Sequence, residues 1–331
     1  MKMPNCCRIL ACLCAAMTLT VAAAPAAAAA AAEEYPSRPI RIIVPFAAGG
    51  AVDSIARVLG QQLSLSTGRP VLVENKPGAS ANLGADYVAK AAPDGYTVLL
   101  AANGLATNVT LFPNMPVNTL RDFAPVAQVG FAPLVLVVSK DSPAKNLKDL
   151  ISLAKQQPGK LSYASAGNGS SQHLAGEMFK IAAQIDVLHV PYKGGAPALT
   201  DLLGGRISYM MQNPLEVLPH IKAQQLHALT VAGNKRLALL PDVPTASEAG
   251  LPGFEASVWW GMVVPVKTPQ EIVVKLNAEV QKALASPKVR EKLGEMGVII
   301  SPSTPEQFGA FLKLEIDKWA KVIKTSGIQA D

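Results

Sequence analysis

The sequence predicts an α/β fold in two domains, and three observations support this prediction. The chain has 331 residues, which is about twice the roughly 150 residues of a typical domain. Half of its residues are hydrophobic and 16% are charged, so it can bury a large core and is not intrinsically disordered. Runs of β-branched residues alternate with helical periods, which is the pattern of βαβ units with right-handed crossovers.

The first segment, 1–32, is expected to be a signal peptide that is cleaved near residues 24–32. Lys2 and Arg8 give it a positively charged start, and an apolar stretch and a run of alanines follow. A retained membrane anchor is the weaker interpretation, because alanine is too weakly hydrophobic to hold a membrane span. All four cysteines lie in this segment, so the exported chain would have neither a disulfide nor a cysteine-bound metal.

In the first half of the chain, each of the first two predicted strands is followed by a turn and a helix. The β-branched run Arg38–Pro45 precedes a helix whose apolar residues recur at helical spacing over 55–63. The strand Pro70–Glu74 precedes a helix over Leu83–Ala91, and Thr97–Ala101 is a third strand after a Pro-Asp-Gly turn. This spacing predicts parallel strands.

Five more strands and three helices are expected further along the chain. The strands are Pro133–Val138, Leu161–Ala164, Val187–Val190, Ile207–Met210 and Ala228–Val231, and the helices cover about 147–157, 172–184 and 195–204. The stretches 124–139 and 254–266 lack a helical pattern and are the candidates for strands that pass between the domains. Thr268 and Thr304, each followed by proline, predict the N-caps of two C-terminal helices.

Charge and motifs disfavour nucleic-acid binding and catalysis. The formal net charge is +6 without a block of Lys and Arg, and only 5% of residues are aromatic, so neither a phosphate-binding patch nor stacking platforms for bases are expected. The motifs H-E-x-x-H and G-x-x-x-x-G-K-[ST] are absent, and Ser165 lacks the first glycine of a nucleophile elbow. No enzyme activity, cofactor or metal site is therefore expected.

The turn after the first predicted strand is a candidate ligand-binding loop, because parallel sheets bind ligands beyond the carboxyl ends of their strands. Its glycines allow close approach of backbone N–H groups, and the helix start adds a partial positive charge. The carboxylate that follows the glycines can cap the helix or meet a cationic group of a ligand, and both interpretations stay open. The candidate residues are Phe46, Ala48, Gly49, Gly50 and Asp53.

A turn with the same properties follows the predicted strand Leu161–Ala164. It offers small residues, hydroxyl groups and the N–H groups of a helix start, and two such helix starts facing each other could bind carboxylates. A flexible surface loop with a serine cap is the alternative interpretation. The imidazole in the first turn of the helix is expected to be an oriented polar group rather than a base. The candidate residues are Ser165, Ala166, Gly167, Ser170, Ser171 and His173.

Three more turns, over 103–108, 192–198 and 212–215, could line the same cleft. Apart from Lys193, none of the five turns contains Lys or Arg. An anion would therefore be bound by backbone N–H groups, helix ends, hydroxyls, amides and water rather than by an arginine. The alternative for the asparagines is a plain turn residue. The candidate residues are Asn103, Gly195 and Asn213.

Five segments of the sequence resemble the Bug-type (TctC-like) receptors, which are the periplasmic solute-binding components of tripartite tricarboxylate transporters. The segments keep the family's order and cover nearly the whole chain after residue 32. Alanines at 47 and 48 stand where many members have proline, which leaves the identity of the ligand open. The segments are VPFAAGGAVDSIAR (44–57), ENKPGASANLGADYVAKAAPDGYTVL (74–99), SAGNGSSQHLAGE (165–177), VPYKGGAPALTDLLGG (190–205) and RLALLPDVPTASEAGLPGF (236–254).

This resemblance implies a type II-like, two-domain periplasmic-binding-protein fold, with a ligand cleft between domains that crossing strands join. Domain 1 would comprise 33–136 plus 258–331, and domain 2 would comprise 137–257. The loops over Phe46–Asp53 and Ser165–His173 would hold the ligand between them.

The resemblance also implies a function and partners. The protein would be a periplasmic monomer that closes on a small carboxylate, namely a dicarboxylate, a tricarboxylate, an acidic amino acid or an aromatic acid. It would deliver this ligand to the membrane subunits of a tripartite tricarboxylate transporter. The alternative is a ligand-loaded sensor component that signals to a membrane sensor kinase. No nucleic-acid partner is expected.

Overall fold

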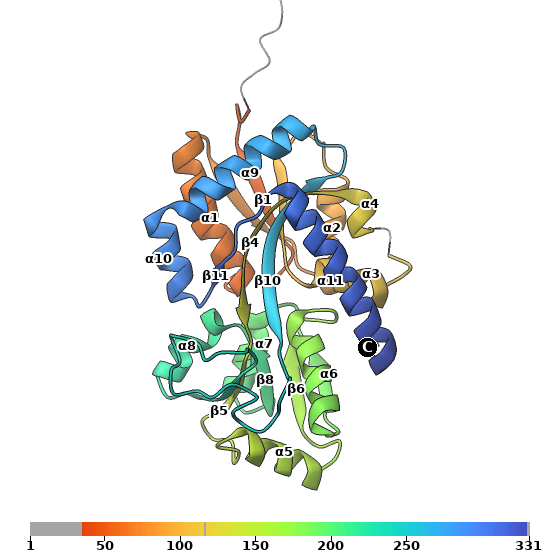
Figure 1. The fold of residues 1–331 in the computed structure, drawn as a ribbon, viewed down its shortest axis with the longest axis vertical. Helices are drawn as coiled ribbons and strands as arrows, with labels where there is room; N and C mark the ends of the chain where they lie inside the picture. Colours follow the sequence, from red (N-terminus) through yellow and green to blue (C-terminus); the bar gives the residue numbers. More distant parts are fainter. Residues whose placement is uncertain (1–34, 116, 330–331) are drawn as a thin grey trace, which may run out of the picture. The chain divides into compact units, whose positions relative to one another are not determined.

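Two β-sheets, each covered by helices on both faces, form the fold of this computed structural model, which describes residues 35–115 and 117–329 (Figure 1). The predicted signal peptide lies outside the described residues. Within the described ranges, no helix is both long enough and apolar enough to cross a membrane.

The first sheet has six strands in the order β11-β4-β10-β3-β1-β2. β1 pairs in parallel with β2 and β3, as the βαβ pattern predicts, whereas β10 runs antiparallel to both β3 and β4. The sheet is therefore mixed rather than purely parallel. Its strands are β1 (Ile40–Val44), β2 (Val71–Asn75), β3 (Thr97–Ala101), β4 (Phe123–Pro133), β10 (Ser257–Pro265) and β11 (Ile299–Ile300).

Alternate side chains of this sheet pack on opposite layers of helices. Ile42 and Val44 lie in one hydrophobic cluster with α1 and α9, and Ile43 between them lies in another with α2, α3 and α11, because successive strand residues face opposite sides of a sheet. The helices of this part are α1 (Ala51–Thr67), α2 (Asn82–Ala89), α3 (Gly104–Leu111), α4 (Thr119–Asp122), α9 (Gln270–Ala285), α10 (Pro287–Glu295) and α11 (Pro305–Ser326), with a 3₁₀ turn, η1 (Ala79–Ala81).

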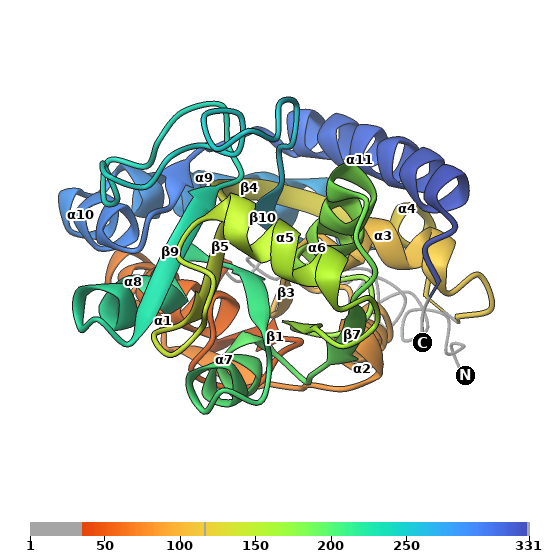
Figure 2. The same cartoon turned by 90° about the horizontal axis from the view of Figure 1, so that it is seen from below.

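The second sheet has five strands in the order β7-β6-β8-β5-β9 (Figure 2). Leu136 and Val138 pack with α5 and α6, and Val135 and Val137 pack with α7 and α8. β6 is parallel to β7 and β8, whereas β5 is antiparallel to β8 and β9. The elements are β5 (Val135–Ser139), α5 (Leu147–Gln156), β6 (Ser162–Ser165), α6 (Ser171–Ala183), β7 (Leu188–Pro191), α7 (Gly195–Leu203), β8 (Tyr209–Gln212), α8 (Pro214–Lys222) and β9 (Leu226–Val231).

The chain crosses from the first sheet to the second at Leu134, between β4 and β5, and returns at Ala256, before β10. Backbone hydrogen bonds join the crossing segments: Leu134 N–H donates to Ala256 O at 2.9 Å, Ala256 N–H to Ala232 O at 2.9 Å, and Ala232 N–H to Leu134 O at 2.8 Å. The predicted fold class, with two sheets joined by crossing strands, is thus confirmed. The residue limits of the two domains stay a prediction.

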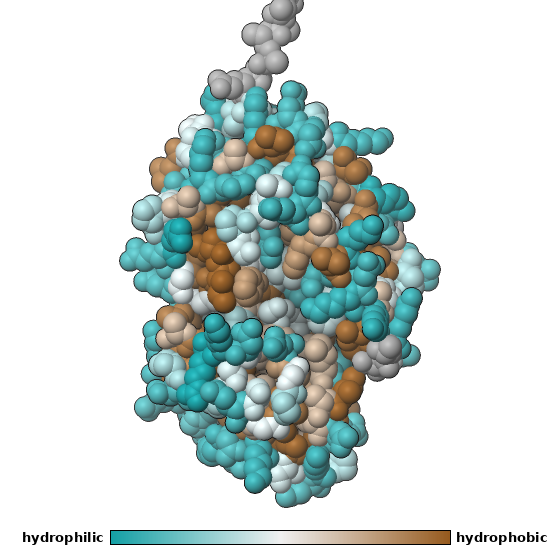
Figure 3. Space-filling model, viewed as in Figure 1, coloured by the Kyte–Doolittle hydropathy of each residue, from teal (hydrophilic) through white to brown (hydrophobic). Residues whose placement is uncertain are grey.

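A groove lined in part by Phe131, Leu237 and Ile299 runs beside this crossing. Figure 3 shows hydrophilic side chains over most of the same face and hydrophobic side chains gathered near β4 and β11. The groove beside the crossing is therefore more apolar than the rest of this face.

The structure corrects several local predictions. The segments 103–108 and 212–215 are not plain turns, because they contain the starts of α3 and α8. Thr304 caps α11 in a capping box with Gln307, as predicted. Thr268 does not cap α9: its hydroxyl donates to Pro265 O at 2.7 Å, and the helix begins at Gln270. Because the helix begins two residues after Thr268, the N-cap position belongs to Pro269, which has no side-chain acceptor.

A Gly261→Ala substitution tests the packing of the central strand β10. A Cβ at Gly261 would lie 2.1 Å from Phe308 Cζ in α11, and overpacking a buried site costs about 1–3 kcal/mol of stability. Gly294→Ala in α10 is the control, because a Cβ there meets nothing within 4 Å and alanine favours a helix by up to about 1 kcal/mol. Urea unfolding should show a loss for the first variant only, and equal stabilities would contradict the packing described.

Candidate functional site

A cavity lies where the two sheets meet, and both contribute to its walls. An adjoining cavity extends between α2 and α3 and shares Phe46, Ala102 and Gly104 with it. The first sheet and its helices contribute Phe46, Gly50, Ala51, Val52, Ala102, Gly104, Val258 and Trp260, and the second contributes Ala166, Ser170, Ser171, Gln172, Gly195, Asn213 and Glu216.

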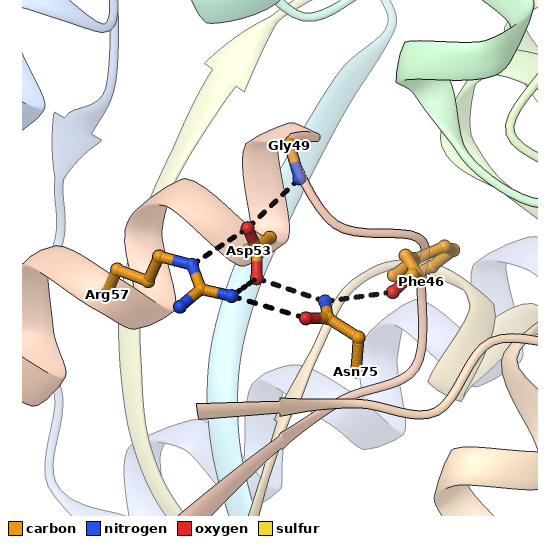
Figure 4. Close-up of polar contacts among 5 residues, drawn as sticks. All are labelled: Phe46, Gly49, Asp53, Arg57 and Asn75. Carbon is orange, nitrogen blue, oxygen red and sulfur yellow. Dashed lines mark hydrogen bonds and ion pairs between the residues drawn. The ribbon is translucent and has the colours of Figure 1, made fainter. Parts of the chain in front are cut away.

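The loop between β1 and α1 is held by one buried carboxylate, that of Asp53 (Figure 4). Gly49 N–H donates to Asp53 Oδ2 at 3.0 Å, and Arg57 binds both carboxylate oxygens at 2.9 and 3.0 Å. Asn75 Nδ2 donates to Asp53 Oδ1 at 3.0 Å and to Phe46 O at 3.1 Å. The carboxylate therefore stabilises the backbone conformation of the loop between Phe46 and Gly49.

These contacts decide the role of Asp53. Burial raises the pKa of its carboxyl, but the hydrogen bonds from Arg57, Gly49 and Asn75 together outweigh burial and bring the pKa below its ordinary value. Asp53 does not line the cavity. In this structure Asp53 organises the loop, and the N-cap position of α1 belongs to Gly50; ligand binding by Asp53 stays a prediction.

The loop between β6 and α6 is held in a comparable way by Ser165 and His173. Gly167 N–H donates to Ser165 Oγ at 3.1 Å, and Gly169 N–H donates to His173 Nδ1 at 3.1 Å. Ser170 caps α6 by accepting the N–H of His173 at 3.3 Å. Neither Ser165 nor His173 lines the cavity. Both side chains accept backbone N–H groups of the loop and so stabilise its conformation.

Stacked rings support this second loop from the interior of the sheet. The imidazoles of His173 and His189 stack with centroids 4.2 Å apart, and His189 in turn stacks on Tyr163 at 4.8 Å. His189 Nε2 also lies 2.7 Å from Ser165 Oγ. Ring packing therefore fixes the orientation of both groups that hold the loop.

Hydrogen bonds across the cleft hold the two sides of the cavity together. Ala51 N–H, at the start of α1, donates to Glu216 Oε1 at 2.8 Å. Thr107 Oγ1 donates to Gly169 O at 2.5 Å, and Ala47 N–H donates to Lys193 O at 3.3 Å. The structure therefore shows the closed arrangement of the cleft.

Half of the predicted site residues line the cavity. The seven that do are Phe46, Gly50, Ala166, Ser170, Ser171, Gly195 and Asn213. Ala48 and Gly49 are exposed, and Asp53, Ser165, Gly167 and His173 are not among the residues that line the cavity. The side chain of Asn103 binds Ser257 O and Trp259 N–H of β10, and Asn103 is not among the residues that line the cavity.

Three polar residues of the cavity were missed by the sequence analysis: Gln172, Glu216 and Trp260. Gln172 Nε2 donates to Gln212 Oε1 at 2.9 Å, which links the start of α6 to the end of β8. Glu216 lies one residue beyond the predicted turn 212–215. Burial raises the pKa of Glu216 even though Ala51 N–H and the Asn213 amide bind its carboxylate. Gln172 lies within the predicted loop Ser165–His173, whereas no local pattern marks Glu216 or Trp260, which tertiary packing brings to the cavity.

The cavity offers hydrogen-bonding groups and almost no charge. The N–H groups of Ser171 and Gln172, at the start of α6, have no acceptor among the described residues. Trp260 Nε1 and Asn213 Oδ1 also have no hydrogen-bond partner in the described part of the chain. No Lys, Arg or His lines it. In the described residues, no group of His, Cys, Asp and Glu could hold a metal ion. Such a cavity suits a small polar ligand that is bound by N–H groups.

An Asp53→Ala substitution tests the role given to this carboxylate. It should destabilise the protein by about 1–3 kcal/mol at pH 7, because the N–H groups of Gly49, Arg57 and Asn75 lose an ionised acceptor. Since the folded-state pKa is lowered, this stability is present above the unfolded-state pKa of about 3.9 and is lost as pH falls through the folded-state pKa.

Urea unfolding at a series of pH values should therefore show that the difference in free energy of unfolding between wild type and Asp53→Ala becomes smaller as the pH falls from 7. Asp141→Ala removes an exposed carboxylate and serves as the control. A gap that is absent at pH 7, or that is unchanged in acid, would show that Asp53 does not hold the loop.

Comparison with known proteins gives a consistent result. The family described as "Tripartite tricarboxylate transporter family receptor" matches residues 55–328. The solved structure of the periplasmic binding protein BugD is 37% identical, with a TM-score of 0.86 over 89% of this chain and 99% of that chain. The same values apply to a Rhodopseudomonas palustris protein solved with adipate: 37% identity, TM-score 0.86, and coverage of 89% and 99%.

A third solved structure, MatC from Rhodopseudomonas palustris with bound malate, is 34% identical, with a TM-score of 0.84 over 87% of this chain and 100% of that chain. These likenesses extend over both sheets. The chain therefore belongs to the tripartite tricarboxylate transporter receptor family, whose members are periplasmic solute-binding proteins and not enzymes.

Proposed function

We propose that this protein is a receptor that closes on a small carboxylate and delivers it to the membrane subunits of a tripartite tricarboxylate transporter. The observation that carries the proposal is the cavity between the two sheets, in which the N–H groups of Ser171 and Gln172 at the start of α6 lack acceptors among the described residues. Helix starts of this kind bind carboxylates.

The relatives and the closed cleft support the same proposal. Two similar proteins were solved with adipate and malate, which are small carboxylates. The hydrogen bonds from Ala51 to Glu216 and from Thr107 to Gly169 cross the cleft, so closure encloses a ligand and changes the surface that a partner contacts. A membrane partner can distinguish loaded from empty receptor only through such a change.

The proposal includes the route and form of the protein. The segment 1–32 directs export and is cleaved near residues 24–32, which leaves a monomeric receptor in the periplasm. Residues 33–136 plus 258–331 form domain 1, and residues 137–257 form domain 2. The strand pair β4 and β10 reaches the crossing between them.

A ligand screen by thermal shift tests the carboxylate class. Small carboxylates should stabilise the protein by about 2.7 kcal/mol at a hundredfold excess over Kd, and neutral sugars should not. Gly167→Val should weaken binding, because Gly167 has a φ of 121° and its Cβ would lie 3.0 Å from Tyr192 O.

Gly250→Val is the matched control, since Gly250 also has a positive φ of 94° but lies outside the cavity. It should bind like wild type. Stabilisation by sugars alone would refute the carboxylate assignment, and unchanged binding by Gly167→Val would refute the role of its loop.

Tryptophan emission provides a second test, because only one face of β10 meets the cavity. Trp260 lines it, whereas Trp259 packs against Phe308 and Phe311 and donates to Glu315. A carboxylate that binds should change the intrinsic emission saturably. Trp260→Phe should remove most of this change and Trp259→Phe should keep it; the opposite result would place the ligand elsewhere.

A further inference from the structure

Glu216, in the first turn of α8, is the one charged side chain among the described residues that line the cavity. Its Oε1 accepts from Ala51 N–H at 2.8 Å and from Asn213 Nδ2 at 3.3 Å. Its Oε2 accepts from Gln212 Nε2 at 2.9 Å. A carboxylate of the second sheet's helices therefore binds the start of the first sheet's helix α1.

Two glycines leave room for this carboxylate. A Cβ at Gly195 would lie 2.2 Å from Glu216 Oε2, and a Cβ at Gly50 would lie 3.5 Å from Glu216 Oε1. Any side chain at Gly195 would displace Glu216, because 2.2 Å is far below a van der Waals contact. One glycine comes from the start of α7 and the other precedes α1, so both walls of the cleft are shaped around the same group.

Glu216 makes the two helix starts at the cavity unequal. At α1, the first N–H group and the partial positive charge of the helix are balanced by Glu216. At α6, the N–H groups of Ser171 and Gln172 have no acceptor among the described residues, and no acidic side chain lines that side. The start of α6 is therefore the position where a ligand carboxylate is best stabilised.

The negative charge of Glu216 favours a cationic group at the end of the ligand that lies away from α6. A carboxylate that is partly removed from water is best stabilised by a positive charge, and no Lys or Arg lines the cavity. A second ligand carboxylate in this cavity would meet Glu216 as a like charge. Asn213 Oδ1, on a side chain that is 4% exposed, has no partner in the described chain and adds an acceptor beside Glu216.

We propose that Glu216 determines the charge specificity of this cavity: the ligand places its single carboxylate at the start of α6 and an ammonium group facing Glu216. The preferred ligand is therefore an amino acid in the chemical sense, and dicarboxylates are disfavoured. This inference rests on the proposed function and narrows it.

Calorimetric titration with four matched pairs of probes tests the proposal. Each pair has the same methylene spacer and ends in an ammonium or in a second carboxylate: glycine and malonate, 3-aminopropanoate and succinate, 4-aminobutanoate and glutarate, and 5-aminopentanoate and adipate. In the best-binding pair, wild type should bind the amino acid at least about tenfold more tightly. Glu216→Gln should abolish or reverse this ratio.

Two variants keep the test decisive. Glu216→Asp retains the charge and should retain the preference, which separates loss of charge from loss of folding. Glu255→Gln removes an exposed carboxylate outside the cavity and should leave every ratio unchanged.

Dicarboxylates that bind wild type as tightly as their partners, or a ratio that Glu216→Gln does not alter, would overturn the role of Glu216 while the receptor remains a carboxylate binder. If none of the eight probes binds, the carboxylate that stabilises the protein most in the thermal-shift screen is titrated instead against wild type and Glu216→Gln. A second carboxylate on that ligand overturns the inference, and an ammonium group whose binding Glu216→Gln weakens supports it. Failure of every carboxylate to bind refutes the proposed function itself.

Discussion

The antiparallel pairing of β4 with β10 is the interaction on which the rest of the structure depends. The two strands are neighbours within the first sheet, and both reach the crossing to the second, where Leu134, Ala232 and Ala256 exchange backbone hydrogen bonds. Because the chain crosses only there within the described residues, this pairing sets how the cavity walls face each other. β10 also lines the cavity with Val258 and Trp260, so one strand links core, crossing and site.

Polar side chains stabilise the loops around the site, and in the proposed function the ligand is bound mainly by backbone N–H groups. Asp53 ties together the loop that follows β1, and Ser165 and His173 do the same for the loop that follows β6. Asn103 joins the start of α3 to β10. Loops that are held in this way keep their N–H groups in place before a ligand arrives, which reduces the ordering cost of binding.

Glu216 connects closure with charge. The same hydrogen bond that joins α8 to the start of α1 also brings a negative charge into a cavity that has no cationic side chain. In the proposed receptor, the two ends of the ligand therefore meet different surroundings: N–H groups at α6 and acceptors beside α8. The relatives solved with adipate and malate show that the family fold admits dicarboxylates, so a single side chain in the wall can redirect specificity without a change of fold.

The sequence by itself determined most strands, most helices and the two loops, because β-branched runs, helical periods, cap residues such as Thr304 and glycine-rich turns are local signals. The tertiary structure alone decided which side chains face the cavity. Asp53 and Asn103 bind other parts of the protein in this structure, and Glu216 reaches Ala51 across 165 positions of sequence. Such a contact has no local signature, since it forms only when the crossing strands bring two distant helix starts together.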